Sequence, residues 1–304
     1  MNSNATEARH GKAEGLDQLA PAEVLRLLAS GQQEAAKVVD QAIPSIAEAA
    51  DLVASTLRSG GRLVYAGAGS AGLVAIADAL ELPGTYGIAP ERIAILFAGG
   101  LPGAADLPGG PEDDAPLGAR DADIIAAEDC VICVSASGST PYTVAVAERA
   151  KARGARLVAM ANNVGARLFE GADVAILLET PPEVIAGSTR MGAATAQKIA
   201  FNMLSTLAAV KLGHVHDGHM VNLRADNGKL RIRAARMVAE IAGIGFEEAR
   251  TWLDAADGSV KVAVLLAAGA AGADAARALL ARSGEVLRTA LTELQAEKSF
   301  MKRA

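Results

Sequence analysis

Residues 61 to 72 have the sequence Gly-Arg-Leu-Val-Tyr-Ala-Gly-Ala-Gly-Ser-Ala-Gly, and this segment indicates the class of fold. Its apolar part, 63–66, predicts a short strand. The small residues 67–72 predict a tight turn, and residues 73–80 then have helical periodicity. A strand that passes through a glycine turn into a helix is the repeating unit of parallel α/β sheets.

The same unit recurs along the chain. Apolar runs predict further strands at 92–97, 130–135, 156–160 and 174–178, and helical periodicity predicts helices at 142–153 and 190–212. Residues 99–122 are rich in Gly, Pro, Ala and Asp and predict a long loop, which in a compact domain is usually functional or mobile. The sequence therefore predicts an α/β protein, a three-layer sandwich with a mostly parallel sheet.

The two ends of the chain differ from this pattern. Residues 1–15 are polar and predict a flexible tail, whereas 21–29 and 32–57 predict N-terminal helices, with Pro44 as a kink or break. Beyond residue 224 the strands stop, and helical segments follow at 230–241, 247–255, 260–268, 274–281 and 285–294. We therefore expect an α/β domain with N-terminal helices at 16–224 and a small helical domain at 225–304.

Composition and charge narrow the range of functions. The formal net charge of the 304 residues is −6, which argues against nucleic acid as a partner. Neither a secretory signal nor a membrane-spanning run is predicted, so we expect a cytoplasmic protein without a membrane partner. Cys130 and Cys133 have the spacing of a redox or metal pair, but their apolar neighbours predict buried residues on opposite faces of a strand.

Three turns between predicted strands and helices are rich in Gly, Ser and Thr, at 67–72, 137–141 and 187–189. The carboxyl ends of parallel strands lie at one edge of the sheet, and helices that start there present free N–H groups to an anion. The alternative is that the small residues only cap helices. We predict a phosphate site made by Gly69, Ser70, Ser137, Gly138, Ser139, Thr140 and Ser188.

Two motifs allow other interpretations. The first turn also matches the dinucleotide fingerprint G-x-G-x-x-G, but the second predicted strand ends without the acid that would hold a ribose. His214, His216 and His219 have a spacing that could bind zinc, yet Asp217-Gly218 between them predicts a plain turn. Neither a nicotinamide cofactor nor a metal site is therefore predicted.

Two carboxylates are candidates for proton transfer. Glu81 lies between two leucines just before Pro83-Gly84, an unusual place for a solvated side chain, and Glu112 lies in the predicted long loop. Paired carboxylates at a sugar site can exchange protons with the substrate. From composition alone, a salt bridge at a helix end for Glu81 and an ordinary polar loop for Glu112 are the simpler explanations.

Several motifs follow one another in a fixed order over residues 16–295. They are Gly61-Arg-Leu-Val-Tyr-Ala-Gly-Ala-Gly69, Glu81-Leu-Pro-Gly-Thr-Tyr-Gly87, Glu112-Asp113, Ala136-Ser-Gly-Ser-Thr-Pro-Tyr142, Gly187-Ser-Thr-Arg190, Thr195-Ala-Gln-Lys198, Asn202-Met-Leu-Ser-Thr206 and Asn227-Gly-Lys-Leu230. Together they resemble the N-acetylmuramic acid 6-phosphate etherases, phosphosugar proteins of the sugar-isomerase (SIS) fold. The pattern extends to the glucokinase regulatory protein, which binds sugar phosphates without turning them over.

The resemblance implies a cofactor-free lyase that removes D-lactate from N-acetylmuramic acid 6-phosphate and leaves N-acetylglucosamine 6-phosphate. In that reaction the sugar ring opens, a base removes the C2 proton, lactate leaves from C3 and water adds back. The resemblance implies Glu112 for the C2 proton, Glu81 for the lactate oxygen and the water, and Lys198 for substrate binding. It also implies a homodimer with pockets between its subunits.

Three positions depart from the family pattern. The etherases carry cationic side chains where this chain has Leu73, Ser139 and Gly192. Because Arg is the natural bidentate partner of phosphate and carboxylate, these changes predict weak activity on N-acetylmuramic acid 6-phosphate and a shifted substrate. A phosphosugar isomerase or deglycase on the same fold, and a sugar-phosphate-binding regulator without turnover, remain alternative functions. The presence of both glutamates favours the lyase over the regulator.

Overall fold

The computed structural model describes residues 5–301 of the chain, except 102, 104–106, 108, 224 and 226. The chain divides into two compact units, one of residues 1–80 and 91–207, the other of residues 81–90 and 208–304. The division therefore falls within a long helix, α6 (Gly192–Lys211), where the sequence predicts it at residue 224. One reason is that the segment 81–90 contacts the helical unit: the Asn222 side-chain amide donates to the Tyr86 carbonyl at 2.9 Å.

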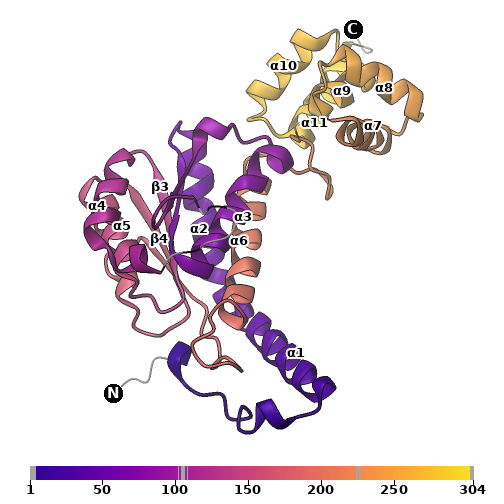
Figure 1. Cartoon of the computed structure of the whole chain (residues 1–304). Coiled ribbons are helices and arrows are strands. Elements are labelled where there is room, and N and C mark those ends of the chain that lie inside the picture. The colour runs from indigo at the N-terminus through magenta and orange to yellow at the C-terminus, as the bar shows by residue number, and fades with distance from the viewer. Residues whose placement is uncertain are drawn as a thin grey trace. The chain divides into compact units, whose positions relative to one another are not determined.

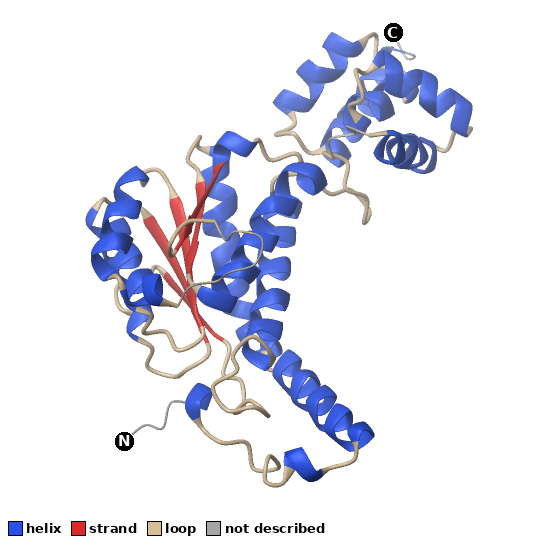
Figure 2. Ribbon diagram, in the orientation of Figure 1, coloured by secondary structure: helices blue, strands red, loops and turns tan. Residues whose placement is uncertain are grey.

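The described part of the first unit contains one sheet of five parallel strands (Figure 2). The strands are β1 (Leu63–Gly67), β2 (Ile93–Phe97), β3 (Cys130–Ser135), β4 (Arg156–Ala161) and β5 (Val174–Leu177). Each predicted strand is confirmed to within one residue at either end. The strand order is β2-β1-β3-β4-β5, so the direction of winding reverses between the neighbours β1 and β3. In doubly wound folds a ligand crevice opens at such a point, beyond the carboxyl ends of the strands.

Helices cover both faces of this sheet. The helices of this part of the chain are α1 (Pro21–Lys37), α2 (Val39–Arg58), α3 (Gly69–Tyr86), α4 (Ala115–Asp121), α5 (Pro141–Ala152) and α6. In Figure 1, α4 and α5 lie on one side of the strands, and α2, α3 and α6 lie on the other. The predicted three-layer α/β sandwich is therefore confirmed.

Strand periodicity divides the core between the two faces. Val64 and Cys133 pack with Tyr142 and its neighbours on the α5 side, whereas the Tyr65 ring lies 5.7 Å from that of Phe201 on α6. Cys130 and Cys133 are buried free thiols, as predicted. Burial raises the pKa of Cys130 to about 12, so this thiol stays protonated and unreactive.

Four segments differ from their predicted structure. The predicted loop at 99–122 contains α4, which begins because the Asp114 carboxylate accepts the Leu117 N–H at 2.8 Å. Helix α3 continues through Pro83, and α2 through Pro44, because a proline removes one helical hydrogen bond without necessarily ending the helix. The segment predicted as a flexible tail is anchored at Thr6, which is buried and bonded to Asn163.

The second unit is helical. Its helices are α7 (Gly228–Ala242), α8 (Phe246–Ala255), α9 (Val260–Ala267), α10 (Ala273–Arg282) and α11 (Leu287–Met301). All five helical segments predicted beyond residue 224 are confirmed. Short 3₁₀ helices elsewhere in the chain are Ala5–Glu7, Leu16–Gln18, Pro90–Arg92, Gly110–Asp113, Ala122–Ile124 and Arg167–Phe169. Among the described helices, none has the length and apolar character needed to cross a bilayer.

Candidate active site at the reversal of strand order

The carboxyl ends of β1 and β3 define the candidate site. Gly67, at the end of β1, is paired with Val134, near the end of β3. The chain enters α3 at Gly69 and enters α5 at Pro141, after the segment that we call the serine turn, residues 135–140. Two helices thus start from adjacent strands where the winding reverses, an arrangement that favours an anionic ligand.

The carboxylate of Glu112 lies against the first of these helix starts. A Cβ atom on Gly69 would be only 2.6 Å from the Glu112 Oε1 atom, so the carboxylate occupies the space that glycine leaves. Gly69 also has a φ of +53°, a left-handed conformation that favours glycine. The loop returns to this place partly because Pro111 packs on Gly99, where a Cβ would lie 2.9 Å from the proline ring.

The surroundings of Glu112 alter its acidity. Burial raises the pKa of this carboxyl above its ordinary value, and the negative charge of Asp113 raises it further. A carboxyl whose pKa moves toward neutrality is better suited to exchange protons with a substrate. The predicted proton-transfer candidate Glu112 therefore lies at the same edge of the sheet as the predicted phosphate site.

Four hydroxyl groups gather in the serine turn. The Ser135 hydroxyl lies 2.7 Å from that of Thr140 and 3.2 Å from that of Ser137. Ser139 donates both its N–H and its hydroxyl to the Ser137 Oγ atom, each at 3.2 Å. The predicted residues Ser137, Ser139 and Thr140 are thus brought together. Ser135 was not predicted, although its position as the last residue of β3 was a usable signal.

The backbone of the serine turn is tightly fitted. Gly138 has a φ of +71°, and a Cβ there would lie 2.2 Å from the Ala166 methyl group. Its N–H donates to the Ser135 hydroxyl at 3.0 Å. Helix α5, which follows, has no side-chain cap on its first amides. The turn therefore offers hydroxyls and uncapped N–H groups, the donors that a phosphate needs.

The third predicted turn is organised differently. The buried carboxylate of Glu183 accepts the N–H groups of Gly192 and Ala193, at 2.9 and 2.8 Å, and so caps α6 from within. The Ser188 N–H donates to the Ile185 carbonyl at 3.0 Å. An internal anion already occupies this helix start, so Ser188 has only its hydroxyl to offer a ligand.

The three departures from the family pattern are not equivalent. Leu73 is 39% exposed in the first turns of α3, and Ser139 is exposed in the serine turn. At Gly192, by contrast, a Cβ would lie 3.0 Å from the Ala35 methyl group and 3.1 Å from the Glu183 carboxylate. A side chain at position 192 would point at α1 and Glu183. The change at Gly192 is therefore not interpreted as a lost phosphate contact.

Lys198 is attached to a buried polar network. Its ammonium donates to the Asn202 side-chain oxygen, and the Asn202 amide donates to Asp78 at 2.9 Å. Tyr65 and Ser205 also donate to Asp78, at 2.7 and 3.0 Å. Burial raises the pKa of Asp78, which is inside the protein between β1, α3 and α6. Within the described chain, no hydrogen bond joins Lys198 to the serine turn.

Glu81 is exposed on α3, in the stretch of that helix that belongs to the second unit. Its carboxylate forms no hydrogen bond or ion pair with any described residue, so the simple helix-end salt bridge is not formed there. A carboxylate without a partner among the described residues is free to meet a ligand or another subunit.

His214, His216 and His219 each have a structural place in the second unit. His216 and His219 exchange backbone hydrogen bonds of 2.9 and 2.8 Å across Asp217-Gly218, so the predicted turn is confirmed. His214 is packed inside the second unit, where burial and the charge of Lys261 lower its pKa to about 4. No cluster of three potential metal ligands occurs in the ranges that the structure describes.

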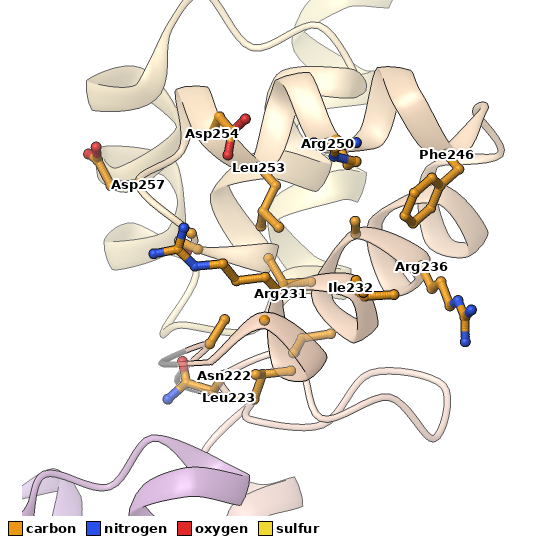
Figure 3. A pocket seen from close by; sticks show the side chains of 17 residues that line it. Asn222, Leu223, Arg231, Ile232, Arg236, Phe246, Arg250, Leu253, Asp254 and Asp257 are labelled. Carbon is orange, nitrogen blue, oxygen red and sulfur yellow. The ribbon is translucent and has the colours of Figure 1, made fainter.

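The second unit has a large open cavity of about 1340 Å³ (Figure 3). It lies between α7 and α8, with Arg231, Ile232, Phe246 and Arg250 in its wall. None of the predicted site residues lines this cavity. It is therefore distinct from the candidate active site.

Comparison with known proteins agrees with the resemblance predicted from the motifs. The SIS domain model matches residues 28–162. An N-acetylmuramic acid 6-phosphate etherase of Symbiobacterium thermophilum is 44% identical, over 87% of this chain and 89% of that protein. The etherase of Rubrobacter xylanophilus is 42% identical, over 95% of this chain and 96% of that protein. The etherase of Mycolicibacterium smegmatis is 41% identical, over 96% of this chain and 98% of that protein. The chain therefore belongs to the N-acetylmuramic acid 6-phosphate etherase family.

Proposed function

We propose that this protein is a cofactor-free carbon–oxygen lyase that removes D-lactate from N-acetylmuramic acid 6-phosphate or a close analogue. The observation that carries the proposal is the placement of the Glu112 carboxylate on Gly69, where β1 ends beside β3 and its serine turn. A proton-transfer group and a set of phosphate donors thereby share one edge of the sheet. The names of the relatives supply the substrate class.

The proposed reaction proceeds through the open-chain sugar, whose aldehyde makes the C2 proton acidic. Glu112 takes this proton, the C3–O bond breaks, and the lactate oxygen receives a proton from Glu81. Water then adds at C3 of the unsaturated aldehyde, gives a proton to Glu81, and C2 recovers its proton from Glu112. The raised pKa of Glu112 supports its role, because a shift toward neutral pH helps a carboxyl both to take and to return a proton.

The phosphate in this proposal is held mainly by neutral donors. Ser70 at the start of α3, together with Ser137, Ser139 and Thr140, supplies hydroxyls, and the uncapped first turn of α5 supplies N–H groups. Gly69 and Gly138 leave room for the ligand to approach the backbone. Ser188 and Lys198 complete the proposed set through their motif positions.

We also propose that the working form is a homodimer. Helix α1, all of whose residues are described, buries Ala35 alone, and its Leu25 is 65% exposed. On α3, Leu73 and Leu80 are 39% and 66% exposed, and Glu81 follows Leu80 directly. Apolar faces of this kind usually mark contact surfaces, so a second copy would cover them and would approach Glu81. Mass measurement in solution, with Leu80→Glu expected to give monomers, tests this part.

We place this activity in the cytoplasm. The two described cysteines are free thiols, which fits a reducing compartment. A phosphorylated sugar as substrate is consistent with the same location.

The test is to incubate the purified protein with N-acetylmuramic acid 6-phosphate in D₂O and to measure released lactate and deuterium at C2. Lactate release with C2 deuterium supports the lyase. A ketose formed without lactate would indicate an isomerase, and binding without exchange would indicate a regulator. Glu112→Gln should abolish both signals while Asp113→Asn, its neighbour and matched control, should keep them.

A further inference from the structure

Glu112 and the serine turn belong to different segments of the chain, and a pair of short contacts joins them. Glu112 lies in the 3₁₀ helix Gly110–Asp113, and α4 begins immediately afterwards. Asp114 connects the two, because its carboxylate caps α4 at the Leu117 N–H. Because Glu112 lies two residues before this cap, we expect a shift of α4 to move Glu112.

Helix α4 touches α5 with its backbone. A Cβ on Gly118 would lie 2.3 Å from the Tyr142 carbonyl oxygen, so no larger residue fits at this crossing. Figure 1 shows the two helices side by side on one face of the sheet. At the last residue of α4, the Asp121 carboxylate accepts a hydrogen bond of 2.7 Å from the Tyr142 hydroxyl. The Tyr142 side chain is completely buried.

Tyr142 also lies next to the serine turn. It is the second residue of α5 and follows Thr140 by two positions, and the Thr140 hydroxyl is bonded to Ser135. One side chain thus connects the end of α4 with the segment that bears the phosphate donors. We propose that the hydrogen bond from Tyr142 to Asp121 is a positioning device that fixes Glu112 relative to the serine turn. The inference rests on the proposed function only in the role it gives to Glu112.

A single hydrogen bond can have this effect because α4 is short. Its seven residues form fewer than two turns beyond the cap, and a helix of this length depends on its contacts for its place. Burial raises the pKa of Tyr142, followed by its bond to Asp121, so the phenol remains a hydrogen-bond donor throughout any practical assay range. Two residues beyond α4, the Asp123 carboxylate also pairs with Arg149 on α5 at 2.6 Å, but this ion pair is exposed, and exposed pairs contribute little. The bond to Tyr142 is made by the last residue of α4 itself.

The variants separate positioning from simple loss of stability. Tyr142→Phe and Asp121→Ala each remove the bond, whereas Asp121→Asn keeps an oxygen acceptor and should rescue it. Tyr65→Phe is the matched control, because Tyr65 is equally buried and donates to a carboxylate, Asp78, at the same distance of 2.7 Å. It removes a bond of the same kind without touching α4, and it serves as the control for the pKa measurement, because Asp78 belongs to the network that holds Lys198.

Two measurements decide the matter. In steady-state kinetics, Tyr142→Phe and Asp121→Ala should lower kcat about tenfold or more while KM changes less than threefold, since a base misplaced by about 1 Å can cost a hundredfold. Independently of turnover, ¹³Cδ NMR of labelled glutamate reports the pKa of Glu112, with Glu112→Gln to assign the signal. Asp113 is the charged group that acts on Glu112, and it is unchanged in all these variants.

We expect the pKa of Glu112 to fall toward its ordinary value in Tyr142→Phe and Asp121→Ala, because the carboxyl moves toward water. It should stay raised in Asp121→Asn and in Tyr65→Phe. An unchanged Glu112 pKa in Tyr142→Phe, or an equal fall in the Tyr65→Phe control, would overturn the inference. The NMR titration of Glu112 needs no substrate. If the protein released no lactate, the proposed function would be refuted, but the outcome of the titration would still test the positioning role of Tyr142.

Discussion

Replacing Gly69 with alanine tests the contact on which the candidate site depends. The structure shows two separate unfavourable effects of this substitution, one on the backbone and one on the Glu112 side chain. The left-handed φ of +53° costs an alanine about 1–2 kcal/mol whatever surrounds it. The new Cβ would also lie 2.6 Å from the Glu112 Oε1 atom, whereas ordinary contact begins at 3.4 Å, so the carboxylate must retreat by about 0.8 Å.

The retreat affects catalysis more than folding. A displacement near 1 Å of a proton-transfer group can cost up to about a hundredfold in rate, so we expect kcat for lactate release to fall about ten- to a hundredfold. Gly171→Ala is the matched control, because Gly171 has a φ of +72° and a Cβ added there would have no atom within 4 Å. It should lose comparable stability, a few degrees in Tm, and retain its kcat.

The assay combines initial rates of lactate release with thermal melting of both variants and the wild type. Equal Tm losses with a kcat deficit only in Gly69→Ala would support the placement of Glu112. If Gly69→Ala turned over substrate as fast as Gly171→Ala, the contact between Gly69 and Glu112 would be irrelevant to the reaction. The proton-transfer role of Glu112 would then have no structural support.

Other predictions concern acidity, binding and the substituted positions. Asp113→Asn removes a charge that raises the pKa of Glu112, so the acidic limb of kcat/KM, where the base becomes protonated, should move to lower pH in a pH–rate profile. Ser137→Ala removes the acceptor of two Ser139 hydrogen bonds and should raise KM about five- to tenfold, at about 1 kcal/mol, in titrations with substrate. We expect a wild-type kcat/KM for N-acetylmuramic acid 6-phosphate below about 10⁴ M⁻¹s⁻¹, and Ser139→Arg should raise it about tenfold or more. Gly192→Lys should lower Tm without such a gain in kcat/KM.

The strands and most helices could be predicted because their signals are local. Apolar runs marked the strands, and glycine turns marked where helices begin, so the order of elements followed from neighbouring residues. Helix α4 was not predictable in this way. Its segment is rich in Gly and Pro, and it becomes helical through the Asp114 cap and the close contact of Gly118 with Tyr142 on α5. That contact joins residues far apart in the sequence.

The candidate site could be predicted only in part, for the same reason. The glycine and serine turns could be recognised in the sequence. That two of them lie side by side follows only from the strand order, which places β1 beside β3. The role of Glu183 as an internal cap of α6 was missed, because nothing in Pro181-Pro-Glu183 indicates that its carboxylate meets the amides of Gly192 and Ala193. The sequence showed that Gly192 departs from the family without showing where its side chain would point.

The structure divides the divergence of this chain into two kinds of change. Gly192 faces α1 and Glu183, so a change of side chain there alters packing within the first unit. Ser139 lies among the hydroxyls of the serine turn, where it is a neutral donor in place of the cationic side chain that the family resemblance implies. Neutral hydrogen bonds contribute about 0.5–1.5 kcal/mol, against about 1.5–3 for charged ones, so we expect this change to weaken the hold on phosphate. Glu112 lies against Gly69 and is not affected by it. Since a phosphate contact is made in ground state and transition state alike, we expect its loss to raise KM and to leave the chemistry at C2 unchanged. We therefore expect Ser139 to weaken binding of the same class of substrate without a change of reaction.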